Sequence, residues 1–203
     1  MSPDRNSGAT RERLIQAAIE LISERGYAAT GVGPVCQRAG VAKTALYWHF
    51  GSKEGLVAAV VERVGTTWIE ELQKATYLEG DAPQRLERLI VEWRRLLLEQ
   101  PQLIRLPMVV QLEQGEGSER IADALRTIWA RAERALVEGI EDSIGPGLPD
   151  LDLVAHTTIT LLQGAALRQI VLPDEVYLDR VLAELRRTLV LLLGDRLGGD
   201  RSL

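Results

Sequence analysis

The feature that most constrains the fold is the stretch from Ala39 to Lys53, which predicts a tight turn, a helix of about two turns and the start of a longer helix. A helix this short is not stable alone in water, so it must pack on other helices. Leu46 and Phe50 lie four residues apart and are expected to point inward together. The opposite face is predicted to carry Lys43, Thr44, Tyr47 and Trp48.

A second short helix is predicted just before this stretch, from Pro34 to Ala39. Gly40 follows it and can adopt the positive φ with which many helices end. Two short helices joined by a tight turn that contains glycine are typical of a helix-turn-helix, whose second helix fits the major groove of DNA. The sequence therefore predicts a DNA-binding element at this position.

Motifs in this region resemble the TetR family of bacterial transcriptional regulators. In chain order they are Gly26-Tyr27 at the end of a first helix, Ala39-Gly40-Val41 at the turn, Leu46-Tyr47-Trp48-His49-Phe50 on the recognition helix, and Lys53 at the start of a fourth helix. The resemblance is confined to the N-terminal part of the chain, because beyond it the family shares mainly an architecture of helices. It implies a homodimer that binds DNA and responds to a small effector.

The residues expected to contact DNA are Lys43, Thr44, Ala45, Tyr47, Trp48, His49 and Lys53. Lys43 begins the recognition helix, where it can reach a phosphate or the O6/N7 edge of a guanine. A cation such as Lys53 in the first turn of a helix opposes the macrodipole unless an anion lies nearby, which favours a phosphate contact. The resemblance implies that His49 lies against the DNA backbone. The alternatives are solvated lysines, and a place in the core for Tyr47 and Trp48.

Two positions depart from the family pattern. Gly31 stands where a Ser or Thr usually caps the second helix and binds phosphate, and Ala42 stands where Ser is common at the turn. Neither residue offers a hydroxyl group. We therefore expect more of the affinity for DNA to come from Lys43, Tyr47, His49 and Lys53.

The charge distribution is compatible with DNA binding, although the whole chain has a net charge of -5. Residues 1–63 contain eight Lys or Arg and six Asp or Glu, so this region has a charge of +2 and the remainder carries -7. The Debye length is roughly 8 Å at physiological salt, so a distant acidic domain has little effect on a basic surface at the DNA.

The composition argues for a soluble protein of the cytoplasm. The single Cys36 rules out an internal disulfide framework and is expected to be a small buried residue of the second helix. No signal segment is predicted, and the longest uncharged run, Leu153 to Leu167, is too short and too polar to span a bilayer. With two distant histidines and one cysteine, the sequence offers neither metal ligands nor a nucleophile with its base. We expect no enzyme, metal, cofactor or membrane partner.

Apolar residues recur at helical spacing along the chain, and the pattern predicts an all-α fold of about nine helices. Ser52 and Asp81 are predicted N-caps, and Pro107 is predicted to kink or break a sixth helix. The fourth helix is long enough to link two domains. We expect a flexible arm at residues 1–9, a helix-turn-helix domain at 10–55, and a ligand-binding and dimerisation domain at 56–203.

Dimerisation is predicted from an eighth helix, about residues 150–171, that is apolar on nearly every side and must be covered. A ninth helix, about residues 174–193, is amphipathic, and the two helices from two subunits can form a four-helix bundle. The expected interface residues are Leu161, Leu162, Ala165, Ala166, Leu182, Leu185 and Leu189. A two-fold protein predicts a pseudo-palindromic operator.

The larger helical region has no motif of its own, and the resemblance implies a pocket whose ligand alters the separation of the recognition helices. Bulky or polar residues in otherwise apolar helices are the pocket candidates: Trp68, Trp93, Met108, Gln111, Trp129, His156 and Gln163. The effector is expected to be hydrophobic and the regulator a repressor. Each candidate can instead belong to the core or the dimer interface, and an architectural DNA-binding protein without an effector is the alternative function.

Overall fold

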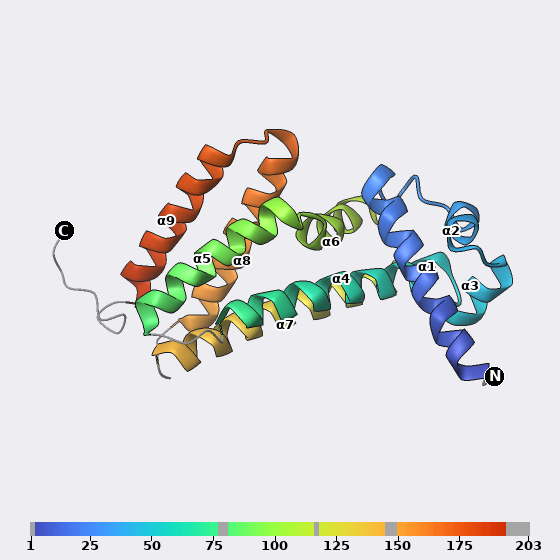
Figure 1. The fold of residues 1–203 in the computed structure, drawn as a ribbon, viewed down its shortest axis with the longest axis horizontal. Helices are drawn as coiled ribbons and strands as arrows, with labels where there is room; N and C mark the ends of the chain where they lie inside the picture. Colours follow the sequence, from blue (N-terminus) through green and yellow to red (C-terminus); the bar gives the residue numbers. More distant parts are fainter. Residues whose placement is uncertain (1–2, 77–80, 116–117, 145–149, 194–203) are drawn as a thin grey trace. The chain divides into compact units, whose positions relative to one another are not determined.

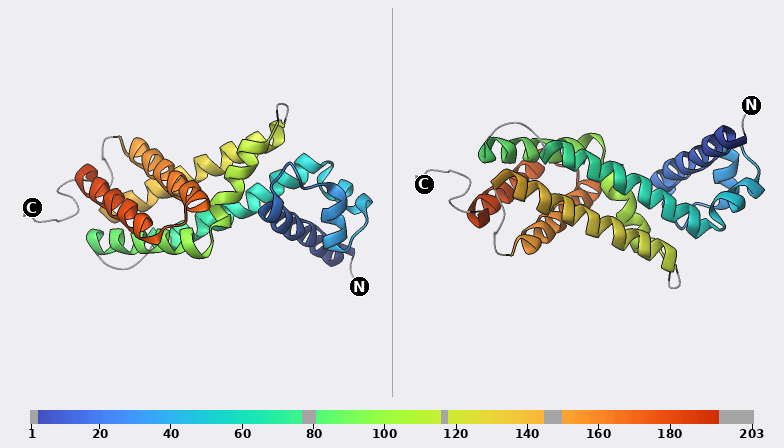
Figure 2. Two further views of the ribbon diagram at one scale, coloured as in Figure 1. Left: turned by 90° about the horizontal axis from the view of Figure 1, so that it is seen from above. Right: turned by 90° about the horizontal axis from the view of Figure 1, so that it is seen from below.

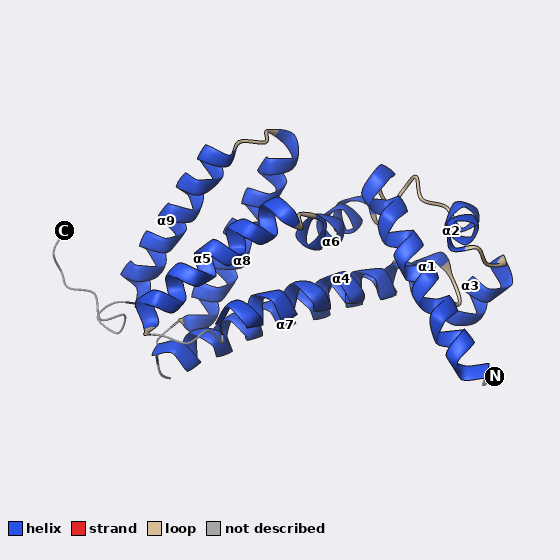
Figure 3. Cartoon of the chain, in the orientation of Figure 1, coloured by secondary structure: helices blue, strands red, loops and turns tan. Residues whose placement is uncertain are grey.

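A computed structural model describes residues 3–76, 81–115, 118–144 and 150–193. These residues form nine α-helices and no strand (Figures 1 and 3). The helices are α1 Pro3–Arg25, α2 Val32–Ala39, α3 Lys43–Phe50, α4 Lys53–Thr76, α5 Ala82–Glu99, α6 Gln102–Glu113, α7 Glu119–Ile144, α8 Leu151–Val171 and α9 Glu175–Leu193. The predicted all-α class is confirmed. None of the helices in these ranges has both the length and the hydropathy needed to cross a bilayer.

The chain divides into two compact units, and the division differs from the expected boundary at residue 55. Unit 1 contains residues 1–66 and 105–128, and unit 2 contains residues 67–104 and 129–203. Helices α4, α6 and α7 each run from one unit into the other. The helix-turn-helix therefore shares its unit with most of α6 and the first part of α7, which lie far away in sequence.

In unit 1, α1, α2 and α3 pack on one another and bury the residues that the apolar spacing predicted. Leu14 and Leu21 of α1 and Leu46 of α3 are at most 1% exposed. Gly40 ends α2 with φ 65°, and its N–H bonds to the Gln37 carbonyl at 3.2 Å. This left-handed residue makes the tight turn of the helix-turn-helix, as expected from the sequence.

The local capping signals are confirmed. The Ser52 hydroxyl accepts a hydrogen bond from the Gly55 N–H at 3.1 Å at the start of α4. The Asp81 carboxylate accepts one from the Gln84 N–H at 3.0 Å at the start of α5, where Pro83 occupies the first turn. Both bonds satisfy a backbone donor that has no partner within its helix.

Unit 2 has α5, α8 and α9 at its centre, and α9 packs against both other helices. Two views show α8 and α9 as neighbouring antiparallel helices (Figure 2). Each of the three helices has buried apolar residues, with Trp93 on α5, Leu162 on α8 and Leu182 on α9 all 2% exposed. The core of unit 2 is thus built within one chain.

Two elements differ from the sequence prediction. Residues 3–9 are helical and belong to α1, where the sequence predicted an arm. Proline is well tolerated at the first helical position, where its missing N–H would have no helical partner, and Pro3 occupies that position. Helix α6 also continues through Pro107 without a break, and the buried Leu106 and Val110 on either side hold it in place.

Gly65 lies where α4 meets α7 inside unit 1, and replacing it with alanine should destabilise the fold. An added Cβ would lie 2.8 Å from Cδ1 of Ile128, which is only 1% exposed and has no room to move. We expect Gly65→Ala to lower the free energy of unfolding by about 1–3 kcal/mol. Chemical denaturation measures this change.

Gly8 in α1 provides the matched control, since a Cβ there would meet nothing within 4 Å. Gly8→Ala should leave stability unchanged or raise it by up to about 1 kcal/mol through helix propensity. Equal effects of the two substitutions would contradict the tight packing of α4 on α7.

Candidate nucleic-acid interface

Helix α3 has a buried face and an exposed face, divided as the helical spacing predicted. Leu46 is fully buried and Phe50 is 6% exposed. Lys43, Thr44, Tyr47 and Trp48 are exposed, while Ala45 and His49 are half-buried; these six residues with Lys53 form the expected DNA-contacting set. The helix thus presents a basic and aromatic surface while its apolar pair anchors it in unit 1.

The aromatic residues of α3 dominate its exposed surface. Trp48 is 74% exposed and Tyr47 is 51% exposed, so neither takes the alternative place in the core. The Trp48 and His49 rings meet edge to face with centroids 4.6 Å apart. Large exposed aromatics are unusual on a protein surface unless they meet a partner, and their O–H and N–H groups suit contacts to sugar and phosphate.

The cations of the helix-turn-helix differ in their pairing. Arg38 on α2 makes a bidentate ion pair with Glu24, with N to O distances of 2.6 and 3.0 Å. This pair lowers the pKa of the Glu24 carboxyl through the hydrogen bond from Arg38. Lys43 is exposed and has no ion-pair partner among the described residues. It stands at the N-terminus of α3, where a cation opposes the macrodipole unless it meets an anion.

The N-termini of α2 and α3 have no side-chain cap. Gly31 and Ala42 occupy the N-cap positions in extended conformations and make no capping hydrogen bond, and neither helix has an acidic residue in its first turn. This agrees with the departure seen in the sequence. The first backbone N–H groups of both helices therefore remain available to an anion.

Lys53 already has partners inside unit 1. Its Nζ donates to the Tyr27 carbonyl at 3.2 Å and lies 4.3 Å from the centre of the Tyr27 ring. The side chain is half-buried and turned toward the end of α1. An ammonium group has three N–H donors, so a phosphate contact by Lys53 would be made in addition to this structural one.

Cys36 lies on the buried face of α2 and is 3% exposed. Burial raises the pKa of its thiol, an effect that the nearby Lys43 charge partly offsets. A buried thiol with a raised pKa is a poor nucleophile. Over the described ranges, no group of three or more His, Cys, Asp or Glu side chains is arranged to hold a metal ion.

The candidate ligand residues are divided between the two compact units. Met108 and Gln111 belong to unit 1, and the other five belong to unit 2. In unit 2, Trp68 and Trp129 meet edge to face with centroids 5.6 Å apart. His156 is exposed, with Nδ1 2.9 Å from a Glu133 carboxylate oxygen.

Trp93 differs from the other candidates because its indole N–H is buried and has no hydrogen-bond partner among the described residues. A buried N–H in this state is costly unless a bound group accepts from it. Gln163 is half-buried on α8. Among the ligand candidates, Trp93 is therefore the residue whose buried N–H could donate to a bound ligand.

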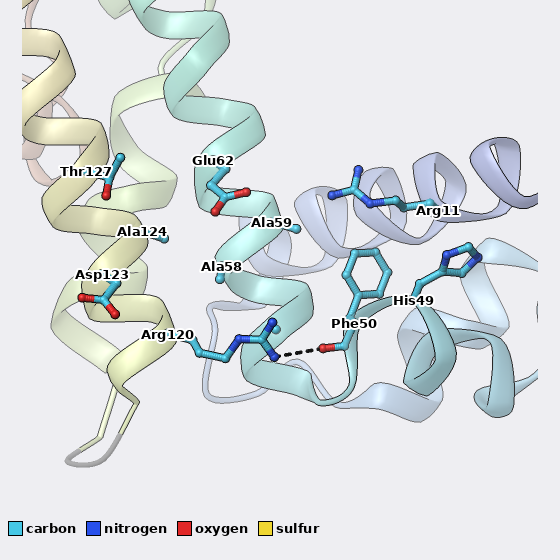
Figure 4. A pocket seen from close by; sticks show the side chains of 11 residues that line it. Arg11, His49, Phe50, Ala58, Ala59, Glu62, Arg120, Asp123, Ala124 and Thr127 are labelled. Atoms are coloured by element: carbon cyan, nitrogen blue, oxygen red, sulfur yellow. Dashed lines mark hydrogen bonds between the residues drawn. The ribbon is translucent and has the colours of Figure 1, made fainter.

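Unit 1 also has a hollow of about 380 Å³, shown in Figure 4, that contains none of the ligand candidates. Its lining is small and apolar along α4 and charged at the rim. The lining residues are Arg11, His49, Phe50, Gly55, Ala58, Ala59, Glu62, Arg120, Asp123, Ala124 and Thr127. The hollow therefore adjoins the C-terminal end of the recognition helix.

The expected dimer-interface residues lie mostly inside their own chain. Leu161 is 40% exposed, whereas Leu162, Ala165, Ala166, Leu182, Leu185 and Leu189 are at most 8% exposed. These six residues are buried within one chain, in which α9 packs against both α5 and α8. Sequence pattern alone could not separate the two apolar sides of α8, because both lack charged residues.

Two contacts to the helix-turn-helix come from residues that sequence reasoning missed. Glu113, the last residue of α6, accepts a hydrogen bond from the Ala28 N–H, and Arg120 of α7 donates one to the Phe50 carbonyl. The partners are 85 and 70 residues apart in sequence. No local spacing or motif marks such pairs.

Comparison with known proteins agrees with this geometry. The model of the family described as bacterial regulatory proteins, tetR family, matches residues 14–60. The HTH-type transcriptional activator FasR of Mycolicibacterium smegmatis is 38% identical over 80 residues, which make up 39% of this chain and 36% of the relative. The sequence similarity to FasR is thus confined to about a third of that protein's length.

Solved structures extend the similarity in fold along the chain. Reduced NemR of E. coli has a TM-score of 0.72 at 21% identity, covering 88% of this chain and 96% of that one. FadR of Bacillus subtilis, solved in complex with stearoyl-CoA, has a TM-score of 0.61 at 22% identity, covering 90% and 96%. Residues 14–60 are thus similar to the tetR family of bacterial regulatory proteins, and the chain shares its fold with these solved structures.

Proposed function

We propose that this protein is a transcriptional regulator that binds a pseudo-palindromic DNA operator as a homodimer and is released by a small hydrophobic effector. The observation that carries the proposal is the exposed face of α3. Lys43, Tyr47 and Trp48 stand exposed on a short helix whose other face, Leu46 and Phe50, is buried. A helix-turn-helix places this helix in the major groove.

The electrostatics of the α3 surface support binding to the DNA backbone. Lys43 has no ion pair in the described part of the chain, and the uncapped N-termini of α2 and α3 point backbone N–H groups outward. A phosphate at either terminus would gain hydrogen bonds and satisfy the macrodipole at once. The paired Arg38 would contribute less, because Glu24 already neutralises it.

Few groups on α3 can read bases by hydrogen bonding. The helix contains no Arg, Asn or Gln for bidentate contacts to guanine or adenine, and Lys43 is its candidate for the O6/N7 edge of a guanine. Thr44, Ala45 and the aromatic rings are suited to apolar contacts with thymine methyl groups. We therefore expect specificity to come from methyl contacts, DNA shape and the spacing of two half-sites.

An uncharged exposed stripe on α8 supports the homodimer. Leu153, Leu161, Leu167 and Val171 are between 40% and 69% exposed and recur at helical spacing. Thr157 and Gly164 fill the positions between them. An apolar stripe of this length is typical of a surface that meets a second copy of the chain, and we move the proposed interface to it.

The effector is the least constrained part of the proposal. The buried Trp93 N–H without an acceptor is consistent with a ligand that has one polar group among apolar contacts. FadR, which shares the fold, was solved with stearoyl-CoA, an acyl ligand. We propose a hydrophobic effector that weakens operator binding, and hence repression as the mode of action.

Recovery of bound genomic DNA tests the central proposal. The purified protein is mixed with fragmented genomic DNA from its host, and the bound fragments are sequenced. The expected result is enrichment of a few sites with inverted repeats near promoters. Uniform recovery of all fragments would instead support an architectural DNA-binding protein without an effector.

The lysines are tested by the salt dependence of operator binding. Lys43→Ala should flatten the slope of log affinity against log salt by about one per half-site, because one phosphate contact is lost. Lys53→Met should have the same effect on the slope and should also lower the melting temperature, since it removes the Tyr27 contact. Fluorescence anisotropy over a salt series measures the slope.

Lys74→Ala is the matched control for the lysine variants, because Lys74 is exposed on α4 in unit 2 and pairs with Glu71. It should leave the slope unchanged. A Lys43→Ala protein with the wild-type slope would remove Lys43 from the DNA surface.

The proposed α8 interface is tested with Leu161→Glu. Two copies of this carboxylate would approach each other across the two-fold axis, so the variant should sediment as a monomer at a concentration where the wild type is a dimer. Val91→Glu is the control, because Val91 is 64% exposed on α5 outside the stripe. A wild-type monomer at micromolar concentration would overturn the homodimer.

A further inference from the structure

The helix-turn-helix is held at both of its ends by residues from α6 and α7. At the entrance, the Ala28 N–H donates to Oε2 of Glu113 at 2.8 Å. Ala28 lies in the turn between α1 and α2, and Glu113 is the last residue of α6. Because the donor is a backbone N–H, this hydrogen bond holds the main chain itself where it enters α2.

At the exit, Nη1 of Arg120 donates to the Phe50 carbonyl at 3.2 Å (Figure 4). Phe50 is the last residue of α3, and the final carbonyls of a helix have no partner within it. A guanidinium at this end also meets the negative pole of the helix dipole. Arg120 thus satisfies the recognition helix at the end opposite Lys43.

Gly55 on α4 makes the Arg120 contact possible. A Cβ at this position would lie 2.8 Å from Nη1 of Arg120, so any larger residue would displace the guanidinium. Within the described ranges, Arg120 has no acidic partner and donates a hydrogen bond to the Phe50 carbonyl. The side chain is therefore committed to the end of α3.

We infer that Glu113 and Arg120 are positioning residues for DNA binding, which hold α2 and α3 in their reading orientation without touching the DNA. The inference rests on the proposed function. Both residues belong to the same compact unit as the helix-turn-helix. Helices α6 and α7 continue from these two residues into unit 2, so the reading helices are fixed to segments that do not belong to the DNA-binding sequence motif.

Substitutions at Arg120 separate positioning from direct contact. Arg120→Ala should weaken operator binding about threefold to tenfold, the range expected for losing one charge-assisted hydrogen bond. Its salt slope should stay at the wild-type value, because no phosphate contact is lost. Arg120→Lys keeps a cationic donor and should recover most of the affinity.

Substitutions at Glu113 test the other end in the same way. Glu113→Gln keeps an oxygen acceptor for the Ala28 N–H and should bind the operator like the wild type. Glu113→Ala removes the acceptor and should weaken binding to a similar degree as Arg120→Ala. If the negative charge of Glu113 acted directly on DNA, Glu113→Gln would instead bind more tightly than the wild type.

Arg126→Ala is the control, since Arg126 lies on the same helix as Arg120 and pairs with Asp123 on the surface. Anisotropy with the wild-type operator over a salt series, together with thermal unfolding of each full-length variant, gives all the readouts. Wild-type affinity in both alanine variants, a reduced salt slope, or an equal loss in Arg126→Ala would overturn the inference. Should either alanine variant fail to fold, the comparison of Arg120→Lys and Glu113→Gln with Arg120→Gln decides the same question. If the wild-type protein bound no specific DNA site, the proposed function would be wrong, and this outcome is distinct from failure of the positioning role.

Discussion

Burial of Leu46 and Phe50 is the constraint on which the proposed DNA-reading surface of α3 depends. Helix α3 has only eight residues and cannot persist in water by itself. Full burial of Leu46 against α1 and α2 is worth about 1.5–3 kcal/mol and fixes the rotation of α3 about its own axis. Because that rotation is fixed, Tyr47 and Trp48 must project outward.

Charge pairing decides which cations of this region remain available to DNA. Arg38 and Arg63 lie close to the reading helices in sequence, yet they pair with Glu24 and Glu12 on α1. Lys43 has no ion-pair partner among the described residues, and neither α2 nor α3 has an acidic residue in its first turn. Lys43 therefore keeps a charge that no acidic side chain of the described residues neutralises.

Local signals in the sequence were sufficient for much of the fold. The Ser52 and Asp81 caps, the Gly40 turn and the two faces of α3 each depend on residues a few positions apart, and the structure confirms them. The inward side of α8 was not predictable in this way, because it depends on where α5 and α9 pack. The Glu113 and Arg120 contacts could not be predicted either, because sequence periodicity relates only residues a few positions apart and these partners are 85 and 70 residues apart.

Gly55 on α4 lies beside the Arg120 contact, and its lack of a side chain is explained by residues outside its own helix. Glycine within a helix lowers its stability by about 0.5–1 kcal/mol relative to alanine, so helix propensity alone does not favour this residue in α4. A Cβ added at Gly55 would collide with the Phe50 carbonyl and would lie 2.8 Å from Nη1 of Arg120. The same missing side chain therefore lets α3 end against α4 and lets α7 reach that end. The absence of a side chain at Gly55 therefore links α4 to the C-terminal end of α3, the helix that carries the proposed DNA-reading surface.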